Sequence, residues 1–218
     1  MLIEEEIIIC PSCEQGYSIN SYVSWSNNQN TPFYSDGHIG GNYPYFISIV
    51  KCLNISCREF FNIEKEKRIP AHYTKTTKDK KDSKTCINLN QVENIGIQEL
   101  EEALETNFCK EDKENEKKTR LLLLRRYNDP IRRNSEYLLL QERRNKMLEN
   151  IERLIELYID TVAIENRILL AEFYREKGDF KTCMELLRNV MPESETERII
   201  LGCIYNYAEQ EEKKVFEV

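Results

Sequence analysis

Histidine is scarce in this sequence. The chain has two histidines among 218 residues, His38 and His72, and both lie in polar segments. It has no Walker phosphate loop, dinucleotide fingerprint, Gly-x-Ser-x-Gly elbow or His-Glu-x-x-His motif. Neighbouring acids such as Glu101-Glu102 are more typical of a solvated helix face than of a catalytic pair. No catalytic constellation is left, and we expect that the protein is not an enzyme.

Long apolar runs are also absent. The runs at residues 7–9 and 121–124 are far shorter than the roughly 20 residues that cross a bilayer. The first six residues include three glutamates, whereas a signal peptide begins with basic residues. Hydrophobic residues make up 40% and charged residues 32%, which suits a soluble chain that can bury a core. We therefore expect a cytoplasmic protein with no membrane partner.

Charge is distributed unevenly along the chain. The net charge is −7, yet residues 1–90 hold ten basic and ten acidic residues, so the remaining 128 residues carry 21 against 28. Binding to bare nucleic acid needs a basic surface. The acidic second part therefore argues against wrapping DNA or RNA and favours a basic or amphipathic protein partner.

Four of the eight cysteines form two closely spaced pairs. Cys10 and Cys13 enclose the turn residues Pro11-Ser12, and Cys52 and Cys57 follow after 38 intervening residues. In a reducing compartment such pairs more often hold a metal than form disulfides. Zinc favours four thiolates in a tetrahedron, and four thiolates leave no open position for catalysis. The spacing predicts one structural Zn²⁺ at Cys10, Cys13, Cys52 and Cys57.

Two alternatives remain open at this site. His38, in a glycine-rich loop, is a rival ligand that could replace Cys57. The four cysteines could also be buried thiols without a metal. Cys183 and Cys203 lie on apolar helix faces and are interpreted as small buried side chains.

The first 63 residues are predicted to form a small β-rich module. Short alternating or β-branched runs indicate strands at residues 7–9, 17–25, 45–50 and 60–63. Nearly half of the aromatic residues lie here, and we interpret them as core rather than as a base-stacking surface. They are Tyr17, Tyr22, Trp25, Phe33, Tyr34, Tyr43, Tyr45, Phe46, Phe60 and Phe61.

Residues 64–90 are predicted to be a polar, basic linker. An alternative function starts from this stretch: its lysines, together with the aromatics before it, would make a nucleic-acid-binding zinc-ribbon protein. The lysines concerned are Lys75, Lys78, Lys80, Lys81 and Lys84.

Residues 91–218 are predicted to form a helical domain. Helices are expected at residues 98–108 and 117–127, then from Pro130 through a long apolar stripe with a break near residues 160–161. A further helix should end at Gly178, the next should begin at Asp179, and residues 196–214 should form the last. The stripe consists of Tyr137, Leu140, Met147, Ile151, Leu154 and Tyr158.

Two features of the helical domain are candidate partner surfaces. Arg125, Arg126, Arg132 and Arg133 surround the predicted helix corner, where they could bind a carboxylate or phosphate or pair with nearby glutamates. Tyr174 lies in the predicted hairpin and is the second candidate.

The N-terminal 60 residues resemble small bacterial zinc-ribbon proteins of undescribed function. The resemblance rests on Cys10-Pro11-Ser12-Cys13, on Tyr34-Ser35-Asp36-Gly37 and on Lys51-Cys52 with Cys57. It implies bound zinc and no particular activity. The four-residue spacer between Cys52 and Cys57 is wider than in that pattern.

One hairpin resembles a tetratricopeptide repeat, with Ala171, Tyr174, Gly178-Asp179-Phe180, Cys183 and Leu187 at the family's offsets. Cys183 stands where that family usually has alanine. The resemblance implies a peptide- or protein-binding groove between stacked helices.

Together these patterns predict an α+β chain, a zinc-ribbon module at residues 1–63 followed by an all-α helical-hairpin domain at residues 91–218. We expect an intracellular adaptor or regulatory protein that binds other proteins. A toxin-immunity factor is the remaining alternative.

Overall fold

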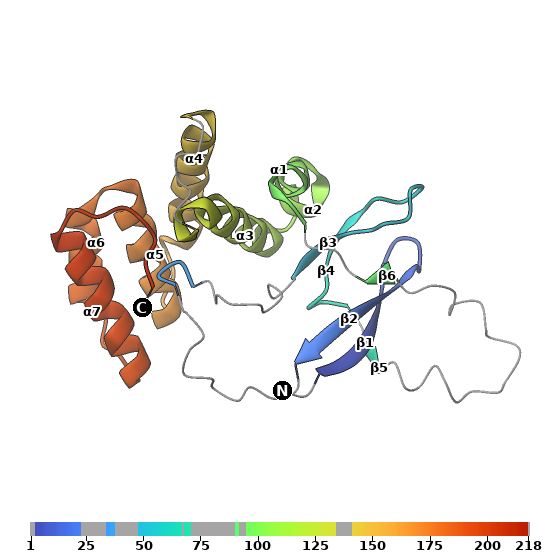
Figure 1. Cartoon of the computed structure of the whole chain (residues 1–218), viewed down its shortest axis with the longest axis horizontal. Helices are drawn as coiled ribbons and strands as arrows, with labels where there is room; N and C mark the ends of the chain where they lie inside the picture. Colours follow the sequence, from blue (N-terminus) through green and yellow to red (C-terminus); the bar gives the residue numbers. More distant parts are fainter. Residues whose placement is uncertain are drawn as a thin grey trace, which may run out of the picture. The chain divides into compact units, whose positions relative to one another are not determined.

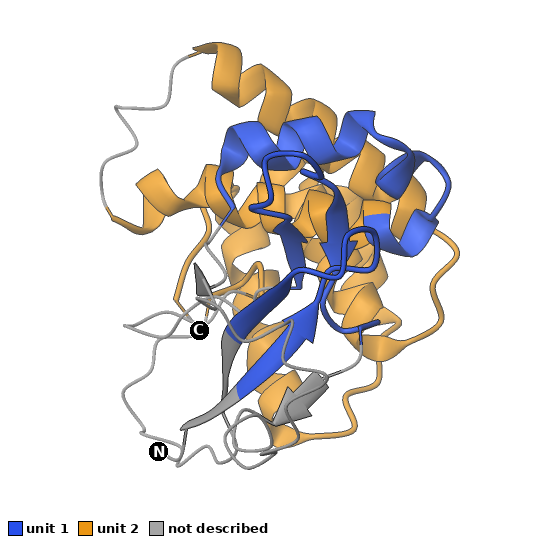
Figure 2. Cartoon of the chain, turned by 90° about the vertical axis from the view of Figure 1, so that its right-hand side faces the viewer, with its two compact units in different colours: residues 1–29, 44–115 blue, residues 30–43, 116–218 orange. Residues whose placement is uncertain are grey.

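The computed structural model describes residues 3–22, 34–37, 48–66, 68–70, 90–91, 95–133 and 141–217. These ranges contain both strands and helices, which confirms the predicted α+β class (Figure 1). The chain divides into two compact units (Figure 2): unit 1 comprises residues 1–29 and 44–115, and unit 2 comprises residues 30–43 and 116–218. Among the described residues, no helix is both long and apolar enough to cross a membrane.

Unit 1 contains two small sheets. The first has the order β5-β1-β2-β6, in which β1 is antiparallel to β2 and β5, and β6 is parallel to β2. The second is an antiparallel pair of β3 and β4. The strands are β1 (Ile3–Ile9), β2 (Gly16–Tyr22), β3 (Ile49–Lys51), β4 (Phe60–Asn62), β5 (Arg68–Pro70) and β6 (Asn90–Gln91). The four predicted strands are confirmed where they fall within the described residues, which exclude 23–25 and 45–47.

The core of unit 1 is built from apolar side chains of both hairpins. Ile8 and Tyr17 from the first hairpin pack with Val50, Phe61 and Ile63 from the second. The rings of Tyr17 and Phe61 lie 6.3 Å apart between centroids. Tyr17, Phe60 and Phe61 are buried, as the core interpretation expects. Trp25 and the lysines at 75–84 lie outside the described residues.

Helices α1 (Ile97–Glu105) and α2 (Asn107–Lys110) replace the single helix predicted at residues 98–108. The break falls at Thr106, whose backbone is extended. The Thr106 hydroxyl donates to the carbonyl of Ala103 at 2.7 Å. This side-chain hydrogen bond replaces the backbone hydrogen bond of a continuing helix and favours a helix end at this residue.

Helix α3 (Lys113–Arg132) corrects a second prediction. The sequence placed a helix boundary at residues 128–130, but the helix continues through Pro130. Proline has no amide for the carbonyl four residues earlier and normally ends or kinks a helix. Here Arg132 supports the last turn, since its guanidinium donates to the carbonyl of Arg125 at 2.7 Å and to the carboxylate of Asp129 at 2.9 Å.

Unit 2 continues with α4 (Gln141–Tyr158), α5 (Ile164–Lys177), α6 (Phe180–Arg188) and α7 (Glu195–Glu209), seen in Figure 1. The predicted break after α4 is confirmed. Ile151, Leu154 and Tyr158 of the predicted stripe are buried, whereas Tyr137 and Leu140 lie outside the described residues.

The α5–α6 hairpin forms as predicted. Gly178 has φ +96° and donates its amide to the carbonyls of Tyr174 and Arg175, which closes α5. Asp179 then caps α6 by accepting from the amide of Thr182 at 3.1 Å. The last helix ends earlier than the predicted residue 214, because the chain turns at Glu211, where φ is +54°.

Helix α5 lies at the centre of unit 2. Leu170 and Phe173 pack in one apolar cluster with α4, while Ile168 and Ala171 pack in another with α6 and α7. The first cluster includes an edge-to-face contact between Tyr158 and Phe173, with centroids 5.5 Å apart. Because α5 is covered on both sides, its hydrophobic residues do not follow a single stripe.

Residues 34–37, which we call the docking segment, also belong to unit 2. They form a tight turn in which the amide of Gly37 donates to the carbonyl of Tyr34 at 2.9 Å. The carboxylate of Asp36 is fully buried and accepts from Asn128 at 3.0 Å and from Arg132. Gly37 has φ +73°, and a Cβ there would meet Arg125 at 3.0 Å, so the position requires glycine.

The C-terminal tail, residues 212–217, packs on the docking segment. Ser35 donates its amide to the carbonyl of Phe216 at 2.9 Å, and the amide of Phe216 donates back to the Ser35 hydroxyl at 3.3 Å. The ring of Phe216 stacks on Tyr207 at 3.8 Å and lies 4.8 Å from the guanidinium carbon of Arg175. The tail therefore joins the docking segment to α5 and α7.

Three ionisable side chains, Glu172, Arg175 and Glu176, are buried on α5. Arg175 makes two hydrogen bonds to Glu172, at 2.6 and 2.7 Å, and a third to the carbonyl of Glu212 in the tail. The Glu176 carboxyl accepts a hydrogen bond from the side-chain amide of Asn128 at 3.2 Å. Burial raises the pKa of the Glu176 carboxyl well above its usual range, and the charges of Glu172 and Asp36 raise it further, against the opposing effects of Arg175 and Asn128.

This pKa predicts a pH-dependent stability. In the unfolded chain the Glu176 carboxyl ionises near pH 4.3, whereas in the folded protein its raised pKa keeps it protonated to higher pH. The stabilising contribution is therefore complete below about pH 4.3 and is lost as the pH rises through the folded pKa. Glu176→Gln keeps the site neutral, so we expect its Tm to exceed that of the wild type by a few degrees at pH 7.

The measurement is thermal unfolding followed by circular dichroism between pH 4 and pH 8. The gain should shrink towards pH 4, where both proteins are neutral at this position. Glu185→Gln, at an exposed position on α6, is the matched control and should show no such gain. A Tm difference that is the same at every pH would contradict the assignment.

Candidate metal centre

The first cysteine pair lies in the turn that joins β1 to β2. The amide of Cys10 donates to the carbonyl of Gln15 at 2.9 Å, and that of Glu14 donates to the carbonyl of Cys10 at 3.0 Å. Glu14 has φ +59°, a left-handed conformation that closes the turn. Backbone amides of the same turn also reach the sulfurs: Ser12 and Cys13 donate to Cys10, and Gln15 donates to Cys13. The turn is thus shaped to support two thiolates.

The second pair lies in the turn between β3 and β4 and repeats this geometry. Arg58 directly follows Cys57, as Glu14 follows Cys13, and it has φ +54°. Its amide donates to the carbonyl of Asn54 at 3.0 Å, the same four-residue step as in the first turn. The amide of Cys52 closes the hairpin on the carbonyl of Glu59 at 2.8 Å.

The wider spacer of this pair has a structural explanation. Its two extra residues lie within the turn, where the Asn54 side chain accepts from the amide of Ser56 at 3.0 Å. Ile55 at the tip is 86% exposed.

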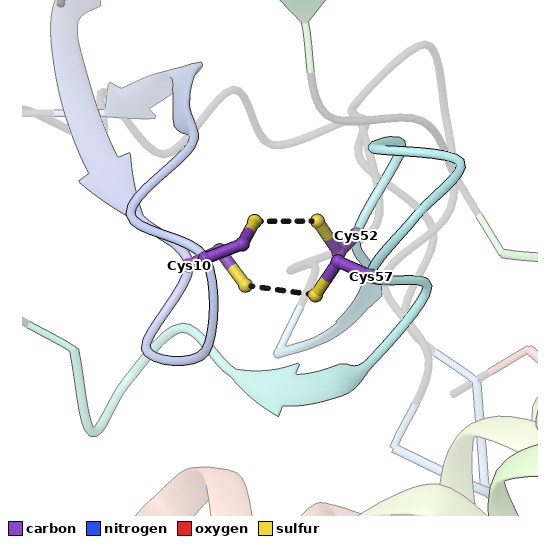
Figure 3. A group of neighbouring side chains, drawn as sticks. Cys10, Cys52 and Cys57 are labelled. Carbon is purple, nitrogen blue, oxygen red and sulfur yellow. Dashed lines mark hydrogen bonds between the residues drawn. The ribbon is translucent and has the colours of Figure 1, made fainter.

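The two turns bring all four sulfurs together (Figure 3). The sulfur of Cys10 lies 3.8 Å from that of Cys57, and the sulfur of Cys13 lies 3.5 Å from that of Cys52. All four sulfurs lie within 4.8 Å of one another. A zinc ion at about 2.3 Å from each of four sulfurs implies sulfur–sulfur edges of about 3.8 Å. The four sulfurs are therefore close enough to hold one metal ion, which is consistent with a zinc site.

Disulfide bonds do not account for this cluster. A disulfide joins its sulfurs at about 2.05 Å, and all four residues are free cysteines. Cys10 and Cys52 are buried, while Cys13 and Cys57 are partly exposed. His38 lies outside the described residues, so its alternative as a ligand remains a prediction, although four sulfurs are already within reach of one ion.

The four thiols differ in acidity. Burial raises the pKa of Cys10 to about 12, against the amide hydrogen bonds from Ser12 and Cys13. At Cys13, burial is outweighed by hydrogen bonds from Gln15 and the other cysteines, which lower the pKa to about 7. Four negative thiolates so close together would repel one another, and a divalent cation removes that cost.

Tyr17 of β2 contacts the cysteine cluster through its hydroxyl. Its hydroxyl lies 2.9 Å from the sulfur of Cys52 and accepts from the amide of Leu53 at 2.9 Å. Burial, followed by the neighbouring Cys52, raises the pKa of the phenol, so the hydroxyl stays protonated at neutral pH and can donate to a Cys52 thiolate. Tyr17 thus fixes the orientation of one ligand, as partners outside the coordination sphere commonly do.

The predicted partner surface is occupied in part by the chain itself. Arg132 pairs with Asp36 and Asp129, and Arg125 donates to the carbonyl of Asp36 at 3.3 Å. Arg126 lies 3.6 Å from the carboxylate of Asp129. Arg133 is exposed, and Tyr174 is half-buried between the two apolar clusters of unit 2. Their use by a partner stays a prediction.

Sequence reasoning missed the contributions of Tyr17 and Asp36. Tyr17 was one aromatic among ten in the module, and its distance from Cys52 in the sequence hides their contact. Asp36 belonged to a motif quoted only for its resemblance. An isolated acid in a glycine-containing turn, in a chain with an arginine cluster elsewhere, is the signal that could have indicated an internal ion pair.

Comparison with known proteins adds no identification: no family model, curated protein or solved structure matches this chain.

The contact of Tyr17 gives a second prediction. Tyr17→Phe keeps the ring against Phe61 but removes the hydroxyl, leaving the Cys52 sulfur and the Leu53 amide without that partner. We expect zinc affinity to fall by about tenfold. Competition with a chromophoric chelator measures the affinity. Tyr205→Phe, which removes a hydroxyl that accepts from Arg188 in unit 2, is the control and should bind zinc as tightly as the wild type. Equal affinities for all three proteins would count against this assignment.

Proposed function

We propose that this chain is a metal-stabilised adaptor or regulatory protein, in which four cysteines hold one structural Zn²⁺ and the helical unit binds another protein. The observation that carries the proposal is the convergence of four sulfurs from two separate turns to within 4.8 Å of one another. Four sulfur ligands fill the coordination sphere of a tetrahedral Zn²⁺ and leave no position for water or substrate. Such a set suits a structural ion rather than a catalytic one.

The architecture of unit 1 supports a folding role for the metal. Its core is a small set of side chains from two short hairpins, to which the four cysteines themselves contribute. Small β modules of this kind bury too little apolar surface to be stable alone, and a structural ion commonly supplies the remaining free energy. The ion would join the β1–β2 turn to the β3–β4 turn.

The helical unit is proposed as the binding part because of its hairpin. Small side chains at Ala171 and Cys183 are fully buried, which allows α5 and α6 to approach closely, and α7 packs on α6. This packing supports the proposal of a tetratricopeptide-like hairpin that binds another protein. The acidic excess after residue 90 favours a partner with a basic surface.

Metal analysis tests the first half of the proposal. Purified protein should contain one zinc per chain by elemental mass spectrometry, and X-ray absorption should find four sulfur ligands and no nitrogen or water. The double variant Cys10→Ser, Cys13→Ser should lose the metal, whereas Cys203→Ser should keep it. A nitrogen ligand would instead support His38, and zinc retained by the double variant would disprove the ligand set.

A capture experiment from the native host tests the second half. Wild type and Cys203→Ser should retain the same protein partner, identified by mass spectrometry, and 1 M salt should release it if the contact is electrostatic. The double cysteine variant should fail to retain it. Retention of nucleic acid in place of a protein would contradict the adaptor function.

A further inference from the structure

The docking segment has an unusual position in the chain. Residues 34–37 belong to unit 2, yet they lie in the sequence between Cys13 and Cys52, two cysteines of unit 1. A metal ion that holds both cysteines closes the chain between them into a loop. The docking segment is part of that loop.

Unit 2 is incomplete without the docking segment. Arg132 has a side chain only 5% exposed, and its guanidinium pairs with the fully buried carboxylate of Asp36. Removal of one partner from a buried ion pair leaves an uncompensated charge and is strongly unfavourable. Ser35 also supplies both hydrogen bonds to Phe216 in the C-terminal tail, one from its backbone amide and one to its side-chain hydroxyl.

The docking segment is connected to the helices of unit 2 by a stretch of chain that belongs to unit 1. From Gly37 it runs back through residues 44–115 of unit 1 before it re-enters unit 2 at Glu116. When unit 1 is folded, much of that connection is a compact body. When unit 1 is unfolded, the whole connection is open chain, and the entropy lost on docking increases with its length. Docking should then weaken by about tenfold.

We propose that metal binding at the four cysteines controls the docking of residues 34–37 into the helical unit. The proposal rests on the proposed metal centre and describes its regulation of the binding unit. With metal bound, Asp36 neutralises Arg132, and Ser35 holds the C-terminal tail. With metal removed, the docking segment is undocked about ten times more often, and whenever it leaves, Arg132 keeps Asp129 but loses Asp36, and Phe216 loses its hydrogen bonds to Ser35. Metal loss in unit 1 thereby changes the contacts of Arg132 and of the C-terminal tail in unit 2.

Hydrogen exchange on the full chain tests this proposal. Zinc-loaded protein is compared with protein stripped by a high-affinity zinc chelator, and elemental analysis confirms that the ion has left. We expect exchange in residues 212–217 to rise by about tenfold on stripping, because the Phe216 amide depends on Ser35. Exchange in α6, which takes no part in the hydrogen bonds of the docking segment described above, should stay unchanged.

Two variants of the docking segment should imitate metal loss while zinc stays bound. Asp36→Asn removes the charge that pairs with Arg132, and Gly37→Ala places a methyl group against Arg125 at a positive φ. Both should leave the segment largely undocked and so raise exchange in the tail, and chelation should then add little because hardly any docked form is left to lose. Asp160→Asn, in the exposed turn after α4, should behave as the wild type.

The outcomes separate this proposal from the proposed function. If zinc binds and is removed while the tail exchanges at its original rate, the coupling is wrong and the metal centre stands. If α6 exchanges as fast as the tail after stripping, unit 2 unfolds as a whole and a local docking event is disproved. If the protein never binds zinc, the metal centre fails, and the coupling fails with it.

Discussion

The convergence of four cysteine sulfurs is the constraint on which the proposed metal centre of unit 1 depends. The sulfurs come from two turns separated by 38 residues, and the apolar core and the contact of Tyr17 with Cys52 link the two hairpins. Each turn is shaped by its own backbone, through a left-handed residue directly after the second cysteine. The proposed ion would join the two hairpins by bonds to all four sulfurs and would offset the repulsion among the thiolates.

A second constraint governs unit 2. Its interior contains a continuous polar cluster in which Asp36, Asn128, Arg132 and Glu176 contact one another among fully packed apolar helices. Most polar groups of this cluster have partners, whereas the buried Asn128 Oδ1 and Arg132 Nε have no hydrogen-bond partner. Among the described residues, the turn at 34–37 gives Arg132 a second carboxylate beside that of Asp129 and gives Phe216 two hydrogen-bond partners on Ser35.

The sequence predicted local structure best where one residue controls the outcome. Gly178 and Asp179 fixed the α5–α6 corner, because a left-handed closing residue and a capping carboxylate act over a few bonds. The cysteine spacing predicted the four residues that converge. Prediction failed at Pro130, where local preference favoured a helix boundary, and at Thr106, where a single hydroxyl interrupts a helix with good amphipathic pattern. In the first case contacts of Arg132 with Arg125 and Asp129 support a turn that proline disfavours.

By itself, then, the sequence determined the α+β class, the cysteine set and the helical hairpin, since these follow from periodicity, turn chemistry and ligand spacing along a short stretch of chain. The tertiary structure alone decided that Tyr17 supports Cys52 and that residues 34–37 complete the helical unit. Both are contacts between residues far apart in the chain. Their energy depends on burial and on the geometry of the partner, and neither quantity is written in local sequence.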